Sequence, residues 1–256
     1  MGLEAFRTEC QHEVYTSIPN QRFDNPRLTS TLQAIRAGLH SPLTRIEVYR
    51  TLAAYPELWN VYENNTEESF LHLWEMPVAG EEYIIGVDCS EGLNPEGIAD
   101  FDCLHIFSAN SWAQVGVLRG RWESFEFAQL IDAIGNLYGG ADKVLISVLR
   151  NKGESVLSHL LHNHDWQKRI GRDWGGLYYY DEQEILNRVD ITAVGGRKPG
   201  MPENVATKPV MVTALADAIK EDVLILRDEK TVQECLTYVK LPGGRTGGMS
   251  GTHDDC

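Results

Sequence analysis

Acidic side chains stand at two places where this sequence could build a metal site. Asp88 follows directly on the apolar run 83–87, and Asp254 and Asp255 follow a glycine-rich approach late in the chain. Carboxylates are hard oxygen ligands that suit Mg²⁺ or Mn²⁺. Two such ions about 3.5–4 Å apart form the usual clamp for cutting phosphodiesters. The alternative is that Asp88 caps a turn and that Asp254 and Asp255 belong to a solvated tail.

The composition is that of a globular protein with a strong acidic bias. The chain has 256 residues, 43% of them hydrophobic, a net charge of −14 and a pI near 5.0. This length can fold as one large or two small domains. The charge argues against a nonspecific nucleic-acid binder held by bulk charge. It leaves a nuclease open, because metal ions neutralise the repulsion between an acidic site and phosphate.

The cysteines and the hydropathy indicate the cellular compartment in which the protein is expected. The five cysteines are widely spaced, and no pair has the two-residue gap of a zinc knuckle. We therefore expect reduced thiols in a cytosolic protein. No segment approaches the roughly 18 apolar residues of a membrane span, so we expect no membrane partner. The first residues also lack the basic and apolar regions of a signal peptide.

The elements that must position the acids become clear after residue 80. Residues 1–80 look irregular, with helical spacing over 32–39 and 42–54. Short apolar runs then predict strands at 83–87, 103–107 and 114–119, joined by turns as in an antiparallel meander.

Helices and further apolar runs alternate through the rest of the chain. A 3.6-residue period predicts a helix at 123–138. A helix is predicted at 207–219, where Thr207 and Pro209 suit a helix start, and further helices are expected at 153–164 and 231–239. Further strands are predicted at 144–149 and 177–180, with a short apolar run at 223–226. This order predicts a mixed α/β sheet covered by helices.

Two common catalytic motifs are absent. The sequence contains no P-loop and no Gly-x-Ser-x-Gly nucleophile elbow. The histidines His159, His162 and His164 lack the His-Glu-x-x-His pattern, and we interpret them as the polar end of a helix rather than as metal ligands.

Several segments in the same order resemble the nuclease domain of phage terminase large subunits. The first hairpin of that family is similar to 83–88 with Glu91-Gly92 and 100–102, and its next helix and strand to 127–149. Its turn into a helix resembles 150–153, and two later features resemble Thr207-Lys208-Pro209 and Gly251-Thr252-His253-Asp254-Asp255. Upstream, Phe6-Arg7-Thr8-Glu9-Cys10 looks like the segment that closes the family's motor domain.

The resemblance implies a fold, an activity and partners. It implies a ribonuclease H-like fold: a lead-in over 1–80 that resembles the end of the motor domain and its linker, then a nuclease domain over 81–256. The implied activity is metal-dependent cutting of concatemeric double-stranded DNA with two Mg²⁺ or Mn²⁺ ions. The implied partners are DNA, a terminase motor domain, a small terminase subunit and a portal protein, in the host cytoplasm.

The resemblance also assigns roles to residues. Asp88 corresponds to the family's first catalytic aspartate, and Asp254 and Asp255 to its last acidic pair. Acids near enough to support them are Glu91, Asp100 and Asp102. The basic residues predicted to contact DNA are Arg150, Lys152, Lys198, Lys208 and Arg245.

Two departures put the activity in question. The family has an acid on the strand at 144–149, where this sequence has none. Leu149 is the expected counterpart, with Ser147 or Val148 as the alternatives if the register of the strand differs. The family also continues past the acidic pair into a helix, whereas this sequence ends at Cys256, which predicts a truncated domain. Two further hypotheses therefore remain: a catalytically impaired domain that engages DNA or the portal, and another ribonuclease H-like nuclease such as a junction resolvase.

Overall fold

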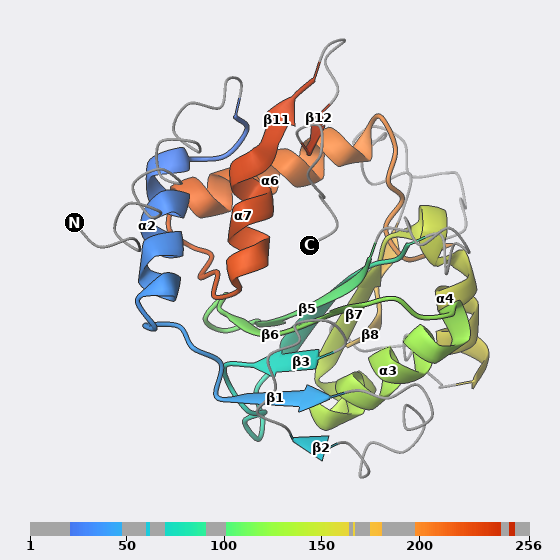
Figure 1. Cartoon of the computed structure of the whole chain (residues 1–256). Helices are drawn as coiled ribbons and strands as arrows, with labels where there is room; N and C mark the ends of the chain where they lie inside the picture. The colour runs from blue at the N-terminus through green and yellow to red at the C-terminus, as the bar shows by residue number, and fades with distance from the viewer. Residues whose placement is uncertain are drawn as a thin grey trace.

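A mixed sheet runs through the centre of the molecule (Figure 1). The computed structural model describes residues 21–47, 60–61, 70–90, 101–163, 166, 175–180, 198–241 and 246–248. Within these residues the sheet has eight strands in the order β2-β1-β3-β6-β5-β4-β7-β8. Their bounds are β1 Thr44–Glu47, β2 Asn60–Val61, β3 Phe70–Leu73, β4 Tyr83–Asp88, β5 Asp102–Ser108, β6 Gln114–Gly120, β7 Val144–Val148 and β8 Gly176–Leu177.

The directions of the strands confirm the predicted meander. Strand β5 pairs antiparallel with both β4 and β6, while β7 pairs parallel with β4 and β8 parallel with β7. The remaining strands form two small two-stranded sheets. They pair β9 Tyr179–Tyr180 with β10 Lys198–Pro199, and β11 Tyr238–Lys240 with β12 Thr246–Gly248.

Helices cover both faces of the sheet (Figure 1). Helices α3 Ser124–Leu137 and α4 Arg150–Asn163 pack together on one face. Helices α2 Asn25–Arg36, α6 Thr207–Lys220 and α7 Glu229–Thr237 lie on the other, with α2 in contact with both of its neighbours. The mixed α/β architecture predicted from the sequence is therefore confirmed.

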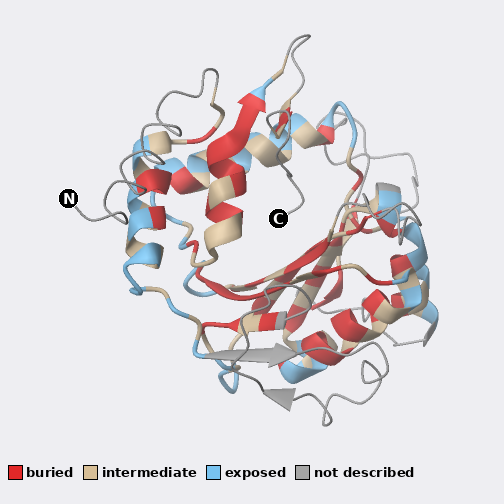
Figure 2. Ribbon diagram, in the orientation of Figure 1, coloured by how far each residue is buried: buried red, intermediate tan, exposed pale blue. Residues whose placement is uncertain are grey.

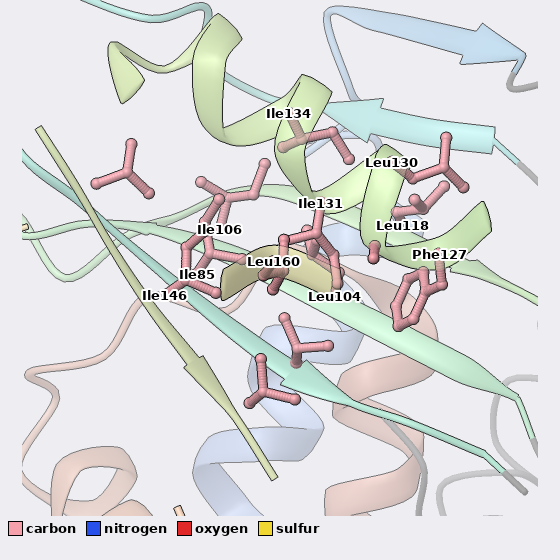
Figure 3. Packing of buried hydrophobic residues seen from close by; sticks show 14 of the residues in the cluster. Ile85, Leu104, Ile106, Leu118, Phe127, Leu130, Ile131, Ile134, Ile146 and Leu160 are labelled. Carbon is pink, nitrogen blue, oxygen red and sulfur yellow. The ribbon is translucent and has the colours of Figure 1, made fainter. Parts of the chain in front are cut away.

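The main core lies between the sheet and the α3–α4 pair (Figure 3). Strand side chains alternate between faces, so Tyr83, Ile85 and Val87 are buried in this core, whereas Ile84, Gly86 and Asp88 are half-buried on the opposite face. Figure 2 shows the corresponding buried stripe along α3, which faces the sheet. The alternation therefore turns Asp88 away from the main core.

The helix boundaries follow from local capping groups. Helix α2 starts earlier than the spacing predicted because Asp24 caps it, accepting a hydrogen bond from the Arg27 backbone N–H at 3.1 Å. A reciprocal capping box between Glu123 and Glu126 starts α3 where predicted. Helix α7 begins after its N-cap Asp228 and ends at Thr237, and the chain continues as β11.

Some predicted elements were wrong. Of the helix expected over 42–54, residues 44–47 form strand β1, because pairing with β2 on one side and β3 on the other satisfies their backbone groups. Residues 48–54 lie outside the described part. The strand expected at 177–180 is divided between β8 and β9, which belong to different sheets. The apolar run at 223–226, to which no element was assigned, contributes one isolated bridge from Ile225 to Ala113.

Residues that precede position 80 contribute both to the sheet, through β1 to β3, and to the second core, through α2. The division of the chain at residue 80 stays a prediction.

Candidate metal centre

Asp88 ends β4, between two neighbouring strands. On one side it pairs with Cys103 of β5. On the other side the Leu149 backbone N–H donates to the Val87 carbonyl at 3.0 Å. The predicted position of Asp88, at the tip of an inner strand, is confirmed.

Leu149 lies beside the end of β4. Ser147 pairs with Gly86, so these two residues share the face of the sheet that Asp88 also occupies. Leu149 follows two residues later and is half-buried. A carboxylate at this position would stand next to Asp88, but leucine offers no oxygen ligand.

Asp102 lies on the opposite face from Asp88. Cys103 is the residue paired with Asp88, so its neighbour Asp102 points toward the main core. Its two carboxylate oxygens accept hydrogen bonds from the Ser90 backbone N–H at 2.8 Å and from the Trp122 backbone N–H at 3.0 Å. Asp102 therefore anchors the turn that follows Asp88, and its role as a supporting acid stays a prediction.

The pKa of the neighbouring Cys89 thiol is also shifted at this position. Burial, reinforced by the carboxylates of Asp102 and Asp88, raises the pKa of Cys89 well above its usual range. Cys89 is therefore a neutral thiol at physiological pH, which is not the form that binds metals.

A buried ion pair lies in the same row of the sheet as Asp88. Arg119 of β6 pairs with Cys103, so Asp88, Cys103 and Arg119 form a row across three strands. Arg119 Nη1 lies 3.3 Å from Glu234 Oε1 of α7, and both side chains are largely buried. Its guanidinium also stacks 4.2 Å from the centroid of the Phe101 ring. The Nε atom of Arg119 is buried without a hydrogen-bond partner among the described residues.

The predicted DNA-contacting residues fall into two groups. Arg150 and Lys152 lie in the first turn of α4, directly after Leu149, and Arg150 lies 5.9 Å from the centroid of the Tyr180 ring. Lys198, exposed in β10, pairs with Tyr180 and so lies in the same region. Lys208, on α6, instead forms an ion pair with Glu203 at 2.6 Å.

A glycine brings the β10 segment against the end of β7. Gly200 has a φ of +77°, and a Cβ added there would lie 2.7 Å from the Val148 carbonyl oxygen. The Met201 N–H donates to that same oxygen at 2.8 Å, and the Arg150 N–H donates to the Met201 carbonyl at 2.8 Å. Glycine at this position therefore permits the approach that places Lys198 near Arg150.

The remaining predicted site residues lie outside the described part of the chain: Glu91, Asp100, Asp254, Asp255 and Arg245. Among the described residues, no group of three or more acidic, histidine or cysteine side chains could hold a metal ion. Asp88 therefore supplies one carboxylate, and the described residues alone do not complete a metal site.

Sequence reasoning missed the polar residues that share the face of Asp88. His105 lies two residues after Cys103 on β5, and Glu234 reaches the row from α7. The alternating pattern of β5 could have placed His105 and Cys103 on one face. No local signal connects Glu234 with Arg119, because they are far apart in sequence.

No model of a known protein family matches the sequence. The large terminase nuclease from thermophilic phage G20c with bound magnesium superposes with a TM-score of 0.53 at 13% identity, over 93% of each chain.

Two further structures match over less of the chain. Another structure of the G20c nuclease matches with a TM-score of 0.48 at 14% identity, over 76% of this chain and 85% of that one. The nuclease domain of the Thermus phage P74-26 large terminase matches with a TM-score of 0.46 at 14% identity, over 76% and 82%.

The first of these matches shows the fold. Over almost the whole length of both chains, this protein has the ribonuclease H-like fold of a large terminase nuclease, as the sequence resemblance implied. Among the helices that the structure describes, none is long and apolar enough to cross a membrane.

Proposed function

We propose that this chain is the nuclease domain of a phage DNA-packaging terminase, with a divalent metal centre at Asp88. The observation that supports this most strongly is the position of Asp88, at the tip of an inner strand in a sheet with the terminase nuclease fold. A neighbour with the same fold was solved with bound magnesium. By this analogy we assign Mg²⁺ or Mn²⁺ as the ion and concatemeric double-stranded DNA as the substrate.

The proposed ligands are Asp88, Asp254 and Asp255. Glu234 of α7 contacts Arg119, which lies in the same row of the sheet as Asp88. Helix α7 leads through β11 to β12, whose Gly248 pairs with Tyr238. Asp254 follows Gly248 by six residues, a reach of up to about 20 Å for an extended chain. When bound, two divalent ions would activate water and stabilise the charge on the phosphate being attacked.

The proposed DNA-binding surface begins beside Leu149. Arg150, Lys152 and Lys198 gather there, with Lys208 and Arg245 as further candidates. Local positive charge of this kind is needed because the chain as a whole is strongly acidic. The terminase motor, the small subunit and the portal protein remain the proposed partners, in the host cytoplasm.

Leu149 favours a second function, that of a catalytically impaired domain which engages DNA or the portal. At the place where a second strand carboxylate would face Asp88, the side chain is apolar. With too few carboxylates, two divalent ions cannot both be held at the separation that in-line displacement needs. We therefore expect the unmodified chain to cut DNA weakly.

A plasmid-nicking assay at equal Mn²⁺ tests both functions. We expect Leu149→Glu to raise metal-dependent nicking, because the new carboxylate stands beside Asp88. Leu145→Glu is the matched control, since Leu145 is half-buried farther along the same face of β7 and pairs with Ile84. Asp88→Asn is the blank.

Each outcome of the assay has a distinct meaning. Robust cutting by the unmodified chain that is lost in Asp88→Asn would support the nuclease and show that another residue supplies the missing ligand. No metal-dependent cutting by either the unmodified chain or Leu149→Glu would contradict the nuclease and favour the impaired domain.

A further inference from the structure

The orientation of the Gln114 side chain is fixed by the backbone that directly precedes helix α7. Gln114 is fully buried at the start of β6, and its Oε1 accepts hydrogen bonds from the backbone N–H groups of Arg227 and Asp228, each at 2.8 Å. A flipped amide would place its NH₂ group against these two donors, so the orientation is settled by the network. Its Nε2 then lies 2.9 Å from His105 Nδ1 and must donate to it.

This donation assigns the tautomer of His105. Because Nδ1 accepts from Gln114, the ring proton is on Nε2. That nitrogen lies 3.4 Å from Cys103 Sγ, so the N–H of His105 donates to the thiol. The direction of both bonds therefore follows from the two backbone donors before α7.

A shift in strand register makes the network possible. Gly116 pairs with Ile106, but Gln114 pairs with Phe107, so the register changes by one residue between these pairs. The shift turns Gln114 onto the face shared by Phe107 and His105. Without the shift, Val115 would pair with Phe107 in place of Gln114.

Cys103 is the residue paired with Asp88. Side chains of directly paired residues on antiparallel strands have Cβ atoms about 4.5–5.5 Å apart. Since Cys103 Sγ accepts from His105, its S–H hydrogen points away from that ring, and the carboxylate across the strand is an acceptor. Cys103 is buried in a small cluster with Trp74 and Val117, which restricts the thiol to few directions.

We propose that Gln114, His105 and Cys103 form a directional hydrogen-bond chain that runs from the start of α7 to the carboxylate of Asp88 and orients it. These three are positioning residues, since none of them would touch the substrate. The orientation of the carboxylate is a property of the protein itself, and only its consequence for metal binding rests on the proposed function.

The carbon-13 NMR signal of the Asp88 carboxyl group in the metal-free chain tests the proposal directly. Labelling aspartate carboxyl carbons and comparing with Asp88→Asn identifies the signal. Cys103→Ala should move the Asp88 signal, because the donor is lost. Cys103→Ser should keep the signal close to its original position, because a hydroxyl group also accepts and donates hydrogen bonds. Val117→Ala is the matched control: it truncates a neighbour in the same buried cluster without removing a donor.

Gln114→Glu tests the direction of the chain in a nearly isosteric variant. A carboxylate at this position accepts on both sides, so His105 must place a proton on Nδ1. We expect nitrogen-15 shifts of the imidazole to show Nδ1 unprotonated in the natural chain and protonated in the variant. The Asp88 signal should move as well. Three outcomes would each overturn the proposal. They are an unprotonated Nε2 of His105 in the natural chain, an Asp88 signal that does not move in Cys103→Ala, and a shift of that signal in Val117→Ala as large as in Cys103→Ala.

Calorimetry with Mn²⁺ then separates this proposal from the proposed function. Loss of the hydrogen bond that orients a metal ligand typically weakens affinity by about 10-fold or more, so we expect that loss for Cys103→Ala and none for Val117→Ala. A natural chain that binds no Mn²⁺ would reject the metal centre, while the NMR result still decides whether the chain of hydrogen bonds exists. Equal Mn²⁺ affinity in the natural chain and Cys103→Ala would reject the positioning role alone.

Discussion

Asp88 and Asp102 lie on opposite faces of the sheet and use their carboxylates differently. Asp102 is buried and accepts hydrogen bonds from two backbone N–H groups, which ties the Cys89–Ser90 turn to the start of the β6–α3 connection. Asp88 is half-buried on the face that carries Cys103 and Arg119. The Asp102 carboxylate thus anchors a turn on the main-core side of the sheet, and the Asp88 carboxylate lies on the side of the candidate site.

The difference between the two aspartates predicts that the same substitution lowers stability more at Asp102 than at Asp88. In Asp102→Asn the new NH₂ group faces a backbone donor, so we expect the free energy of unfolding in urea to fall by about 1–3 kcal/mol. Asp88→Asn should lower it less, since the asparagine side-chain oxygen can still accept a hydrogen bond. Equal losses of stability in the two variants would contradict this division of roles.

Helix α7 is attached to β6 by polar groups near both of its ends. Gln114 accepts from the backbone that precedes the helix, and Arg119 pairs with Glu234 in its second turn. Because α7 leads directly into β11, these contacts also position the start of the β11–β12 hairpin.

The Arg119–Glu234 pair makes the attachment testable by a double-mutant cycle. Arg119→Met or Glu234→Leu alone leaves a buried charge without its partner, and we expect each to lower the free energy of unfolding by on the order of 3 kcal/mol. The double variant should lose much less, since apolar replacements of both partners are often tolerated. Additive losses in urea denaturation would show that the two charges are not coupled.

The end of helix α3 is joined to the β3–β4 connection by tyrosines. The Tyr138 hydroxyl donates to the Glu75 carbonyl at 3.0 Å, and the rings of Tyr138 and Tyr83 pack edge to face. Burial, followed by the nearby Tyr83 and Glu75, raises the pKa of Tyr138, and burial likewise raises that of Tyr83.

These raised pKa values predict a loss of stability in alkali. Unfolded tyrosine ionises near pH 10, so above that pH the unfolded chain releases protons that the folded chain retains. The stabilisation is complete below about pH 10 and falls as the pH rises. Urea denaturation from about pH 9 to about pH 11 should show this fall, and Tyr138→Phe should reduce its slope. An unchanged slope would contradict the assignment to Tyr138.

The sequence predicted those elements whose pattern is local. Apolar runs located β4 to β7, and helical periodicity and helix-start residues located α3, α4, α6 and most of α7, because these signals lie within each segment. Strand β1 was missed because its strand form depends on pairing with β3, which the local pattern does not show. The separate roles of Asp88 and Asp102 depend on the register between β4 and β5, and that register also brings Cys103 and His105 beside the candidate site.

The whole molecule combines a net charge of −14 with basic groups gathered beside Leu149. Binding of DNA must therefore depend on local phosphate contacts, and the affinity should fall as salt rises. Lys152→Ala should reduce the slope of log affinity against log salt by about one. Lys220→Ala, which removes an exposed charge at the end of α6, is the control and should leave the slope unchanged. An affinity independent of salt would argue against a DNA-binding surface.

The metal centre at Asp88 is the claim on which the proposed function depends, and calorimetric titration with Mn²⁺ tests it most directly. We predict that the natural chain binds Mn²⁺, that Asp88→Asn abolishes the binding, and that Asp217→Asn, an exposed position on α6, leaves it intact. Asparagine keeps the size of the side chain but removes the charge that a hard divalent ion requires. Mn²⁺ binding that is unchanged in Asp88→Asn would contradict the assignment of the metal centre.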